Sequence, residues 1–251
     1  MIRISGVDRT YAGDRVPSVE ALENVCLDIK KEEFVSLVGP SGCGKTTLLK
    51  IIAGLYRPTR GQVWIEGTTI TAPRKDIGLV FQRPILLPWR TVLQNVMLPV
   101  EVLRLESERF RRRALDLLSV MDLGEFKDHY PHQLSGGMQQ RVAIARALTH
   151  DPAILLMDEP FGSLDAMTRE ALNLELLRIW GATQKTILFV THSITEAILL
   201  SNRVAIMSQR PGTIIEVVGI DLPFPRTLGM MSSPSFGEYA ATIRALLETR
   251  S

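Results

Sequence analysis

The sequence predicts an α/β fold built on a largely parallel sheet. Two observations predict it: short apolar runs of strand length alternate with longer helical segments, and turn or polar residues bound each apolar run. The strands expected for this sheet are residues 34–38, 77–81, 153–157, 186–190 and 203–207. A helix is expected at residues 46–53, after a glycine-rich loop that follows the first strand.

Two further parts are expected beside this sheet. An earlier pair of runs, residues 2–7 and 61–67, alternates apolar with polar side chains and predicts a small antiparallel β subdomain. Between residues 86 and 151 the pattern becomes helical, and five apolar residues there recur at the spacing of one helix face: Phe110, Ala114, Leu117, Leu118 and Met121. We therefore expect a helical subdomain inserted into the α/β core.

This organisation is that of one domain over residues 1–251. Its expected parts are the α/β core with the β subdomain (1–85 and 152–225), the helical subdomain (86–151) and a C-terminal tail (226–251). Apolar residues between 236 and 247 predict an amphipathic helix in the tail, which Pro223 and Pro225 separate from the core.

Composition excludes several classes of protein. The 251 residues are 45% apolar and 22% charged, which excludes a disordered chain, and the only cysteines, Cys26 and Cys43, exclude a disulfide scaffold. The net charge of +2 lacks the basic excess of most nucleic-acid-binding proteins. No apolar run approaches the ~18 residues of a membrane span, and residues 1–10 lack the apolar region of a signal peptide. We expect a soluble intracellular protein.

The strongest motif is a phosphate-binding loop. Residues Gly39, Pro40, Ser41, Gly42, Cys43, Gly44, Lys45 and Thr46 fit the pattern G-x-x-x-x-G-K-[ST] between a predicted strand and a predicted helix. The glycines let backbone N–H groups turn toward the phosphates, Lys45 reaches the β- and γ-phosphates, and the Thr46 hydroxyl ligates Mg²⁺. We include Thr47, the next residue, among the nucleotide-binding residues.

Two acids end the predicted strand 153–157. Carboxylates at the carboxyl edge of a parallel sheet lie where α/β proteins bind ligands. We expect Asp158 to hold Mg²⁺ through water and Glu159 to act as general base toward the attacking water. Paired with the phosphate loop, these acids indicate nucleotide hydrolysis.

A second anion-binding helix terminus is expected at residues 134–141, Leu-Ser-Gly-Gly-Met-Gln-Gln-Arg. One phosphate loop already binds one triphosphate, so a second terminus is explained if two chains face each other and each Ser135 caps the partner's γ-phosphate. At this point the sequence resembles the nucleotide-binding subunit of an ABC transporter over nearly its whole length. In that family the segment is the signature motif LSGGQ, and here Met138 replaces the usual glutamine, which follows as Gln139.

The resemblance implies a P-loop NTPase core of the RecA-like type and further site residues. Gln82 matches the glutamine that contacts Mg²⁺ and senses the γ-phosphate, and His192 matches the switch histidine. Ser163, Leu164 and Asp165 match the D-loop at the dimer interface, and Tyr11 matches the aromatic residue that stacks on adenine. Nucleotide binding is further assigned to Ser135, Gly136, Gly137, Gln139 and Asp165, and the metal to Thr46, Gln82 and Asp158.

The function implied is an ATPase that uses ATP and Mg²⁺, works as a head-to-tail dimer of two copies, and energises an importer. Its expected partners are membrane permease subunits and, indirectly, a solute-binding protein; its expected location is the cytoplasmic face of the membrane. The stretches LLPWRTVLQNV and MSQRPGTI resemble the nitrate, sulfonate and taurine branch.

Three alternatives remain beside this function. Importers of thiamine-precursor pyrimidines look much the same. A soluble ABC ATPase of DNA repair or translation usually carries a coiled-coil insertion or a second cassette, and this chain has neither. A GTPase switch needs a base-reading N-K-x-D motif, which the sequence lacks.

Two local expectations concern an apolar patch and a thiol. Residues Ile85–Trp89 are a concentrated apolar patch beside Gln82 and mark a partner site if they are exposed. Cys43, among inward N–H groups beside Lys45, is expected to have a lowered pKa and to react readily with maleimide. His129, His132 and His150 have no expected role.

Overall fold

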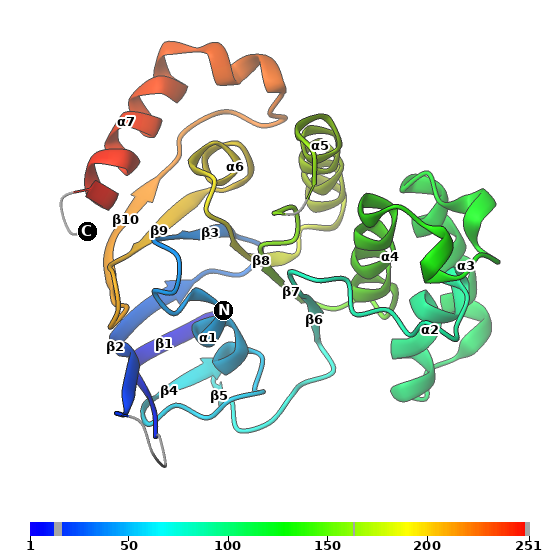
Figure 1. Cartoon of the computed structure of the whole chain (residues 1–251), viewed down its shortest axis with the longest axis horizontal. Coiled ribbons are helices and arrows are strands. Elements are labelled where there is room, and N and C mark those ends of the chain that lie inside the picture. Colours follow the sequence, from blue (N-terminus) through cyan, green and yellow to red (C-terminus); the bar gives the residue numbers. More distant parts are fainter. Residues whose placement is uncertain (13–16, 163, 249–251) are drawn as a thin grey trace.

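Two β-sheets form the framework of the molecule in the computed structural model, which describes residues 1–12, 17–162 and 164–248 (Figure 1). The smaller sheet has the order β2-β1-β4-β5 and is antiparallel throughout. Its strands are β1 (Ile2–Tyr11), β2 (Val19–Ile29), β4 (Arg60–Ile65) and β5 (Thr68–Thr69). The antiparallel pair expected from residues 2–7 and 61–67 is therefore confirmed.

The larger sheet has the order β10-β9-β3-β8-β7-β6. Five of its strands are parallel to one another, and the edge strand β10 is antiparallel to β9. The strands are β3 (Phe34–Val38), β6 (Ile77–Val80), β7 (Ile154–Asp158), β8 (Thr186–Val190), β9 (Arg203–Met207) and β10 (Ile214–Gly219). Because neighbouring parallel strands end at the same edge, the loops after β3, β6, β7 and β8 converge there.

Buried side chains cover both faces of the larger sheet. Strand β3 shows the alternation: Phe34 and Val38 belong to one buried cluster, and Val35 and Leu37 belong to the other. The first cluster takes in helices α5 (Ala166–Thr183), α6 (Ile194–Leu200) and α7 (Pro234–Glu248). The second takes in α1 (Lys45–Ile52) and the smaller sheet, so the larger sheet lies between two layers (Figure 1).

Three helices between residues 86 and 151 pack together at one side of the molecule (Figure 1). They are α2 (Val92–Val102), α3 (Ser107–Val120) and α4 (Gly136–Thr149); the short 3₁₀ helices of the chain are η1 (Gly124–Phe126), η2 (Pro131–Gln133) and η3 (Leu228–Ser232). The helix face expected from Phe110 to Met121 is confirmed, since its five residues are buried or packed against the first cluster. Thr91 caps α2 by accepting from the backbone N–H of Gln94.

The C-terminal helix expected at 236–247 is α7, whose Phe236 and Ile243 are buried. The chain that leads to it is anchored by Arg226, whose buried guanidinium donates to backbone carbonyls of α6 and of the residue after it, among them Ile198 O at 2.7 Å and Ser201 O at 2.8 Å. In the described part of the chain, no helix has both the length and the apolar content of a membrane span.

Candidate functional site

A pocket of about 410 Å³ lies over the loop between β3 and α1. Residues from the smaller sheet, the phosphate loop and three strand ends line it: Tyr11, Val19, Ala21, Ser41, Gly42, Gly44, Lys45, Thr46, Thr47, Gln82, Glu159 and Arg210. Nine of these twelve residues were expected at the site from the sequence, and the other three are Val19, Ala21 and Arg210. The pocket therefore joins the phosphate loop to the acid after β7 in one space.

The phosphate loop (residues 39–46) has the backbone that its glycines permit. Gly42 and Gly44 have φ of 75° and 108°, which L-residues rarely adopt. A Cβ on Gly44 would also lie 2.6 Å from Leu22 Cδ2 and 2.8 Å from Ala21 O, so any side chain would collide with β2. This conformation leads directly into the N-terminus of α1, whose first N–H groups and dipole favour an anion.

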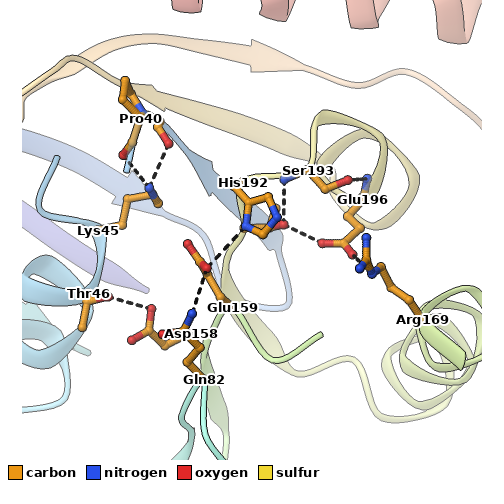
Figure 2. Close-up of polar contacts among 12 residues, drawn as sticks. Pro40, Lys45, Thr46, Gln82, Asp158, Glu159, Arg169, His192, Ser193 and Glu196 are labelled. Atoms are coloured by element: carbon orange, nitrogen blue, oxygen red, sulfur yellow. Dashed lines mark hydrogen bonds and ion pairs between the residues drawn. The ribbon is translucent and has the colours of Figure 1, made fainter. Parts of the chain in front are cut away.

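Lys45 is the positive charge at the base of this loop. Its side chain is buried, and Nζ donates to Gly39 O and Pro40 O at 2.8 Å each (Figure 2). Two neutral acceptors hold the ammonium without neutralising its charge, so Lys45 remains available to a phosphate. The residues present thus fit the triphosphate of a nucleotide.

The expected low pKa of Cys43 is wrong. Cys43 is 1% exposed, and burial raises the pKa of its thiol more than nearby Lys45 lowers it. The side chain packs into the second buried cluster, with Sγ against the Gly39 backbone. Cys43 therefore acts as a small apolar residue beneath the loop.

Asp158 lies at the end of β7 beside Thr46. The Thr46 hydroxyl donates to Asp158 Oδ1 at 3.0 Å (Figure 2), and burial raises the pKa of the carboxyl. A hydroxyl and a carboxylate are the hard oxygen ligands that Mg²⁺ takes together with substrate phosphates. The pair that the sequence assigned to the metal is thus brought together, and its chemistry fits Mg²⁺.

Glu159, Gln82 and His192 meet although they come from the ends of three different strands (Figure 2). Glu159 Oε2 accepts from Gln82 Nε2 at 3.3 Å and lies 3.3 Å from His192 Nδ1. Glu159 has φ of 43°, and its backbone N–H donates to Val190 O at 2.9 Å, which fixes it between β7 and β8. A carboxylate so held, at the wall of a phosphate-binding pocket, is placed to accept a proton from water.

Tyr11 and Arg210 also line the pocket. The Tyr11 hydroxyl lies 3.2 Å from Thr47 Oγ1, and the Arg9 guanidinium lies 4.7 Å from the centre of its ring. Arg210 was not predicted as a site residue. Its loop is held against β2, because Gly212 N donates to Ala21 O at 3.0 Å. The only sequence signal for Arg210 was the MSQRPGTI stretch, which served as a mark of family branch.

The signature residues lie outside this pocket. Ser135 caps α4 by accepting from Met138 N at 3.3 Å, and Ser135 and Gly136 are exposed. None of Ser135, Gly136, Gly137, Gln139 or Asp165 lines the pocket of its own chain. Gln139 Nε2 donates to Pro131 O at 3.0 Å and Leu134 O at 3.3 Å, so its amide hydrogens already serve this chain.

Of residues 163–165, which precede α5, the structure describes Leu164 and Asp165. Asp165 caps α5 by accepting from Thr168 N at 3.0 Å, and this bond keeps the pKa of Asp165 below its usual value. Leu164 is buried, and Ser163 lies outside the described residues.

The apolar patch after Gln82 is partly exposed: Leu86 packs against the first buried cluster, whereas Ile85 and Trp89 face solvent, as the partner hypothesis requires. Trp89 is 70% exposed and Ile85 is 57% exposed. The backbone between them is fixed, because the buried Asn95 donates to Leu87 O at 3.1 Å and Arg90 O at 3.0 Å. The loop thus presents apolar side chains to solvent without being loose.

Comparison with known proteins agrees with this geometry. The ABC transporter family profile matches residues 22–162. An uncharacterized ABC transporter ATP-binding protein of Methanocaldococcus jannaschii is 50% identical over 95% of this chain and 87% of its own. An aliphatic sulfonates import ATP-binding protein of Bacillus cereus is 46% identical (94% and 92%), and a taurine import ATP-binding protein of Rhizobium johnstonii is 42% identical (99% and 97%).

Among solved structures, the dimeric ATP-binding cassette MJ0796 in a post-hydrolysis state with ADP and Pi is similar. Its TM-score is 0.78 at 38% identity, over 89% of this chain and 100% of that one. The fold, the phosphate loop and the similar proteins all indicate the same family. The chain belongs to the ABC transporter ATP-binding family and is an ABC-type ATPase.

Proposed function

We propose that this chain is the ATP-hydrolysing subunit of an importer for a small anion such as nitrate, a sulfonate or taurine. The observation that carries the proposal is that Glu159 and Gln82 line the phosphate-loop pocket and that His192 contacts Glu159 there. Two relatives that cover nearly the whole chain are named for the import of sulfonates and of taurine, which supports the solute class.

In this proposal the chain's own residues divide the work of hydrolysis. The phosphate loop and Lys45 bind the triphosphate, and Thr46 and Asp158, with Gln82, hold Mg²⁺. When bound, Mg²⁺ offsets the negative charge of the β- and γ-phosphates. Glu159 Oε2 orients the attacking water and accepts its proton, a role worth typically 10²–10⁴ in rate. Tyr11 stacks on the adenine.

We further propose that two copies act as a head-to-tail dimer. The α4 N-terminus carries no acidic residue in its first turn and begins at exposed residues, so its N–H groups suit an anion that the chain's own pocket does not bring to it. Ser135, Gly136 and Gly137 would contact the nucleotide of the second copy, and Asp165 would face the interface. The dimeric state of the similar solved cassettes supports this arrangement.

The membrane is reached through a permease in this proposal. Ile85 and Trp89 are exposed on a fixed loop that begins next to Gln82, so a docked permease would act on the residue beside the γ-phosphate. The chain acts as one ATPase domain, with its α/β core, helical subdomain and C-terminal tail divided as expected from the sequence. Its location is then the cytoplasmic face of the membrane.

Reconstitution tests the proposal. A tagged copy is purified from membranes of its own source, and the complex is placed in liposomes with ATP, the purified binding protein and labelled taurine, alkyl sulfonate or nitrate. ATP-dependent uptake of one of these three solutes is expected. Recovery of an active ATPase without any membrane protein would contradict the transport role, and uptake only of a solute that has neither a sulfonate group nor a nitrate ion would contradict the solute class alone.

A further inference from the structure

A buried carboxylate and an arginine lie behind His192, outside the nucleotide pocket (Figure 2). Glu196, on α6, is 7% exposed, and Arg169 lies on the facing helix α5. Arg169 Nε lies 3.7 Å from Glu196 Oε1. Neither residue was singled out from the sequence, and neither contacts the expected position of ATP. Their hydrogen bonds nevertheless reach two segments near Glu159: the loop that carries His192, through Glu196, and the segment that contains Leu164, through Arg169.

Glu196 orders the loop that carries His192. The Thr191 hydroxyl donates to Glu196 Oε2 at 2.5 Å, and the same Thr191 oxygen accepts from Ser193 N at 3.0 Å. Because the Thr191 hydrogen points to Glu196, the lone pairs of the Thr191 oxygen are left to accept from Ser193. His192 lies between these two residues, and both of its neighbours are thus held in place.

Arg169 adds a second connection to this carboxyl group. Burial and, to a smaller extent, the charge of Glu159 raise the pKa of Glu196 above its usual value, and the Thr191 hydroxyl, Arg169 and His192 oppose that rise. Arg169 Nη2 also donates to Leu164 O at 2.8 Å, in the segment that follows Glu159 and precedes α5. Its buried Nε has no hydrogen-bond partner among the described residues, so on that side Arg169 interacts with Glu196 through charge.

We propose that Arg169 and Glu196 are positioning residues that hold His192 against Glu159 and tie its position to that of residues 164–165. A shift of that segment, as when a second copy binds against it, would move Arg169 and be passed through Glu196 to the Thr191–Ser193 loop. This inference rests on the proposed role of His192 in hydrolysis.

The test compares Glu196→Gln with a matched loss of charge elsewhere. Glu196→Gln keeps the shape but presents an amide to Arg169 or to Thr191. We expect kcat for ATP to fall about tenfold, as misplacement of a site group does, with KM changed less than about twofold. The control is Glu33→Gln, which breaks the ion pair of Glu33 with Arg203 (Nη2–Oε2 2.8 Å). This pair lies where β3 and β9 begin, at the end of the strands opposite to the pocket. Glu33→Gln is expected to lower stability and leave kcat unchanged.

A second comparison separates positioning from general stability. In a His192→Ala background, measured by single turnover, Glu196→Gln is expected to cause no further loss, because the side chain that it positions is absent. Arg169→Gln, which keeps the Thr191–Glu196 hydrogen bond, should give a smaller loss of kcat than Glu196→Gln. It serves as the second variant if thermal melting shows that Glu196→Gln is poorly folded.

Three results would count against the inference. An undiminished kcat in both Glu196→Gln and Arg169→Gln would overturn it, as would an equal loss of kcat in Glu33→Gln. An additional loss in the His192→Ala background would show that Glu196 acts through another residue. If His192→Ala alone leaves kcat unchanged, the proposed role of His192 fails, which is distinguishable from the other outcomes.

Discussion

Trp89 offers a direct test of the permease surface, because its side chain is exposed while its loop is fixed. Replacing Trp89 with Ala removes an aromatic group that makes little contact with its own chain. A large aromatic side chain can bury roughly 250 Å², so the 70% exposed fraction leaves roughly 175 Å² for a partner, or about 4 kcal/mol at ~25 cal/mol per Å². This is an upper bound, and truncation of an interface anchor often costs about 2 kcal/mol.

A loss of about 2 kcal/mol weakens assembly with the permease about 30-fold. The isolated subunit should keep its melting temperature and its affinity for ATP, because changes to surface side chains usually alter stability by less than about 0.5 kcal/mol. The assay is titration of the detergent-solubilised permease with each variant, with thermal melts of the isolated subunit.

Val102→Ala is the matched control, since Val102 is equally exposed but lies at the end of α2, outside the 85–89 patch. The control should bind the permease like the parent protein. If Trp89→Ala unfolds the isolated subunit, Trp89 is a structural residue; if it assembles with full affinity, the patch has no partner role. Either result would refute the reasoning.

Three further predictions concern the pocket. Maleimide should label native Cys43 far more slowly than the exposed Cys26, because Cys43 is buried and burial raises its pKa. Mass spectrometry of the two cysteine peptides measures the labelling rates, and equal rates would contradict this prediction. Asp158→Asn should raise the melting temperature of the nucleotide-free protein at pH 7. Burial raises the pKa of Asp158, so the stability that its protonated form contributes is lost as pH rises through that raised pKa, and the neutral amide avoids the loss. The gain in melting temperature should shrink as pH falls below the raised pKa, and no gain at pH 7 would contradict the raised pKa of Asp158. Arg210→Ala should weaken ATP binding severalfold in fluorescence titration, whereas the exposed Arg60→Ala, away from the pocket, should not; equal effects would exclude Arg210 from the site.

The five parallel strands were predictable to within one residue at either end. Four of them consist almost wholly of buried residues, as in Phe34–Val38 and Thr186–Val190, and such runs stand out from their polar surroundings. Strands β2 and β10 were not predicted, for two different reasons. The register of β2 against β1 shifts repeatedly, with Asn24 at φ 44°, so its pattern does not alternate; β10 is an edge strand with no fully buried residue.

The site was predictable where function depends on residues adjacent in sequence. The phosphate loop and the Asp158–Glu159 pair each lie in one short motif, and their geometry follows from the strand and helix around them. The predicted lowering of the Cys43 pKa was wrong because the sequence shows Lys45 beside Cys43 but does not show that Cys43 is buried against the core. Arg210 reaches the pocket only through the pairing of its loop with β2, a contact between segments nearly 190 residues apart.

The central claim is that Glu159 is the general base of ATP hydrolysis, and Glu159→Gln tests it most directly. The variant should bind ATP with the parent affinity, because the phosphate loop and Lys45 are unchanged, while turnover falls by about 10²-fold or more. With ATP it should accumulate as a dimer in light scattering, since hydrolysis no longer reopens it. Lys45→Ala, which removes the phosphate countercharge, is the control expected to lose ATP binding. Undiminished hydrolysis by a folded Glu159→Gln variant, or loss of its ATP binding, would contradict the account.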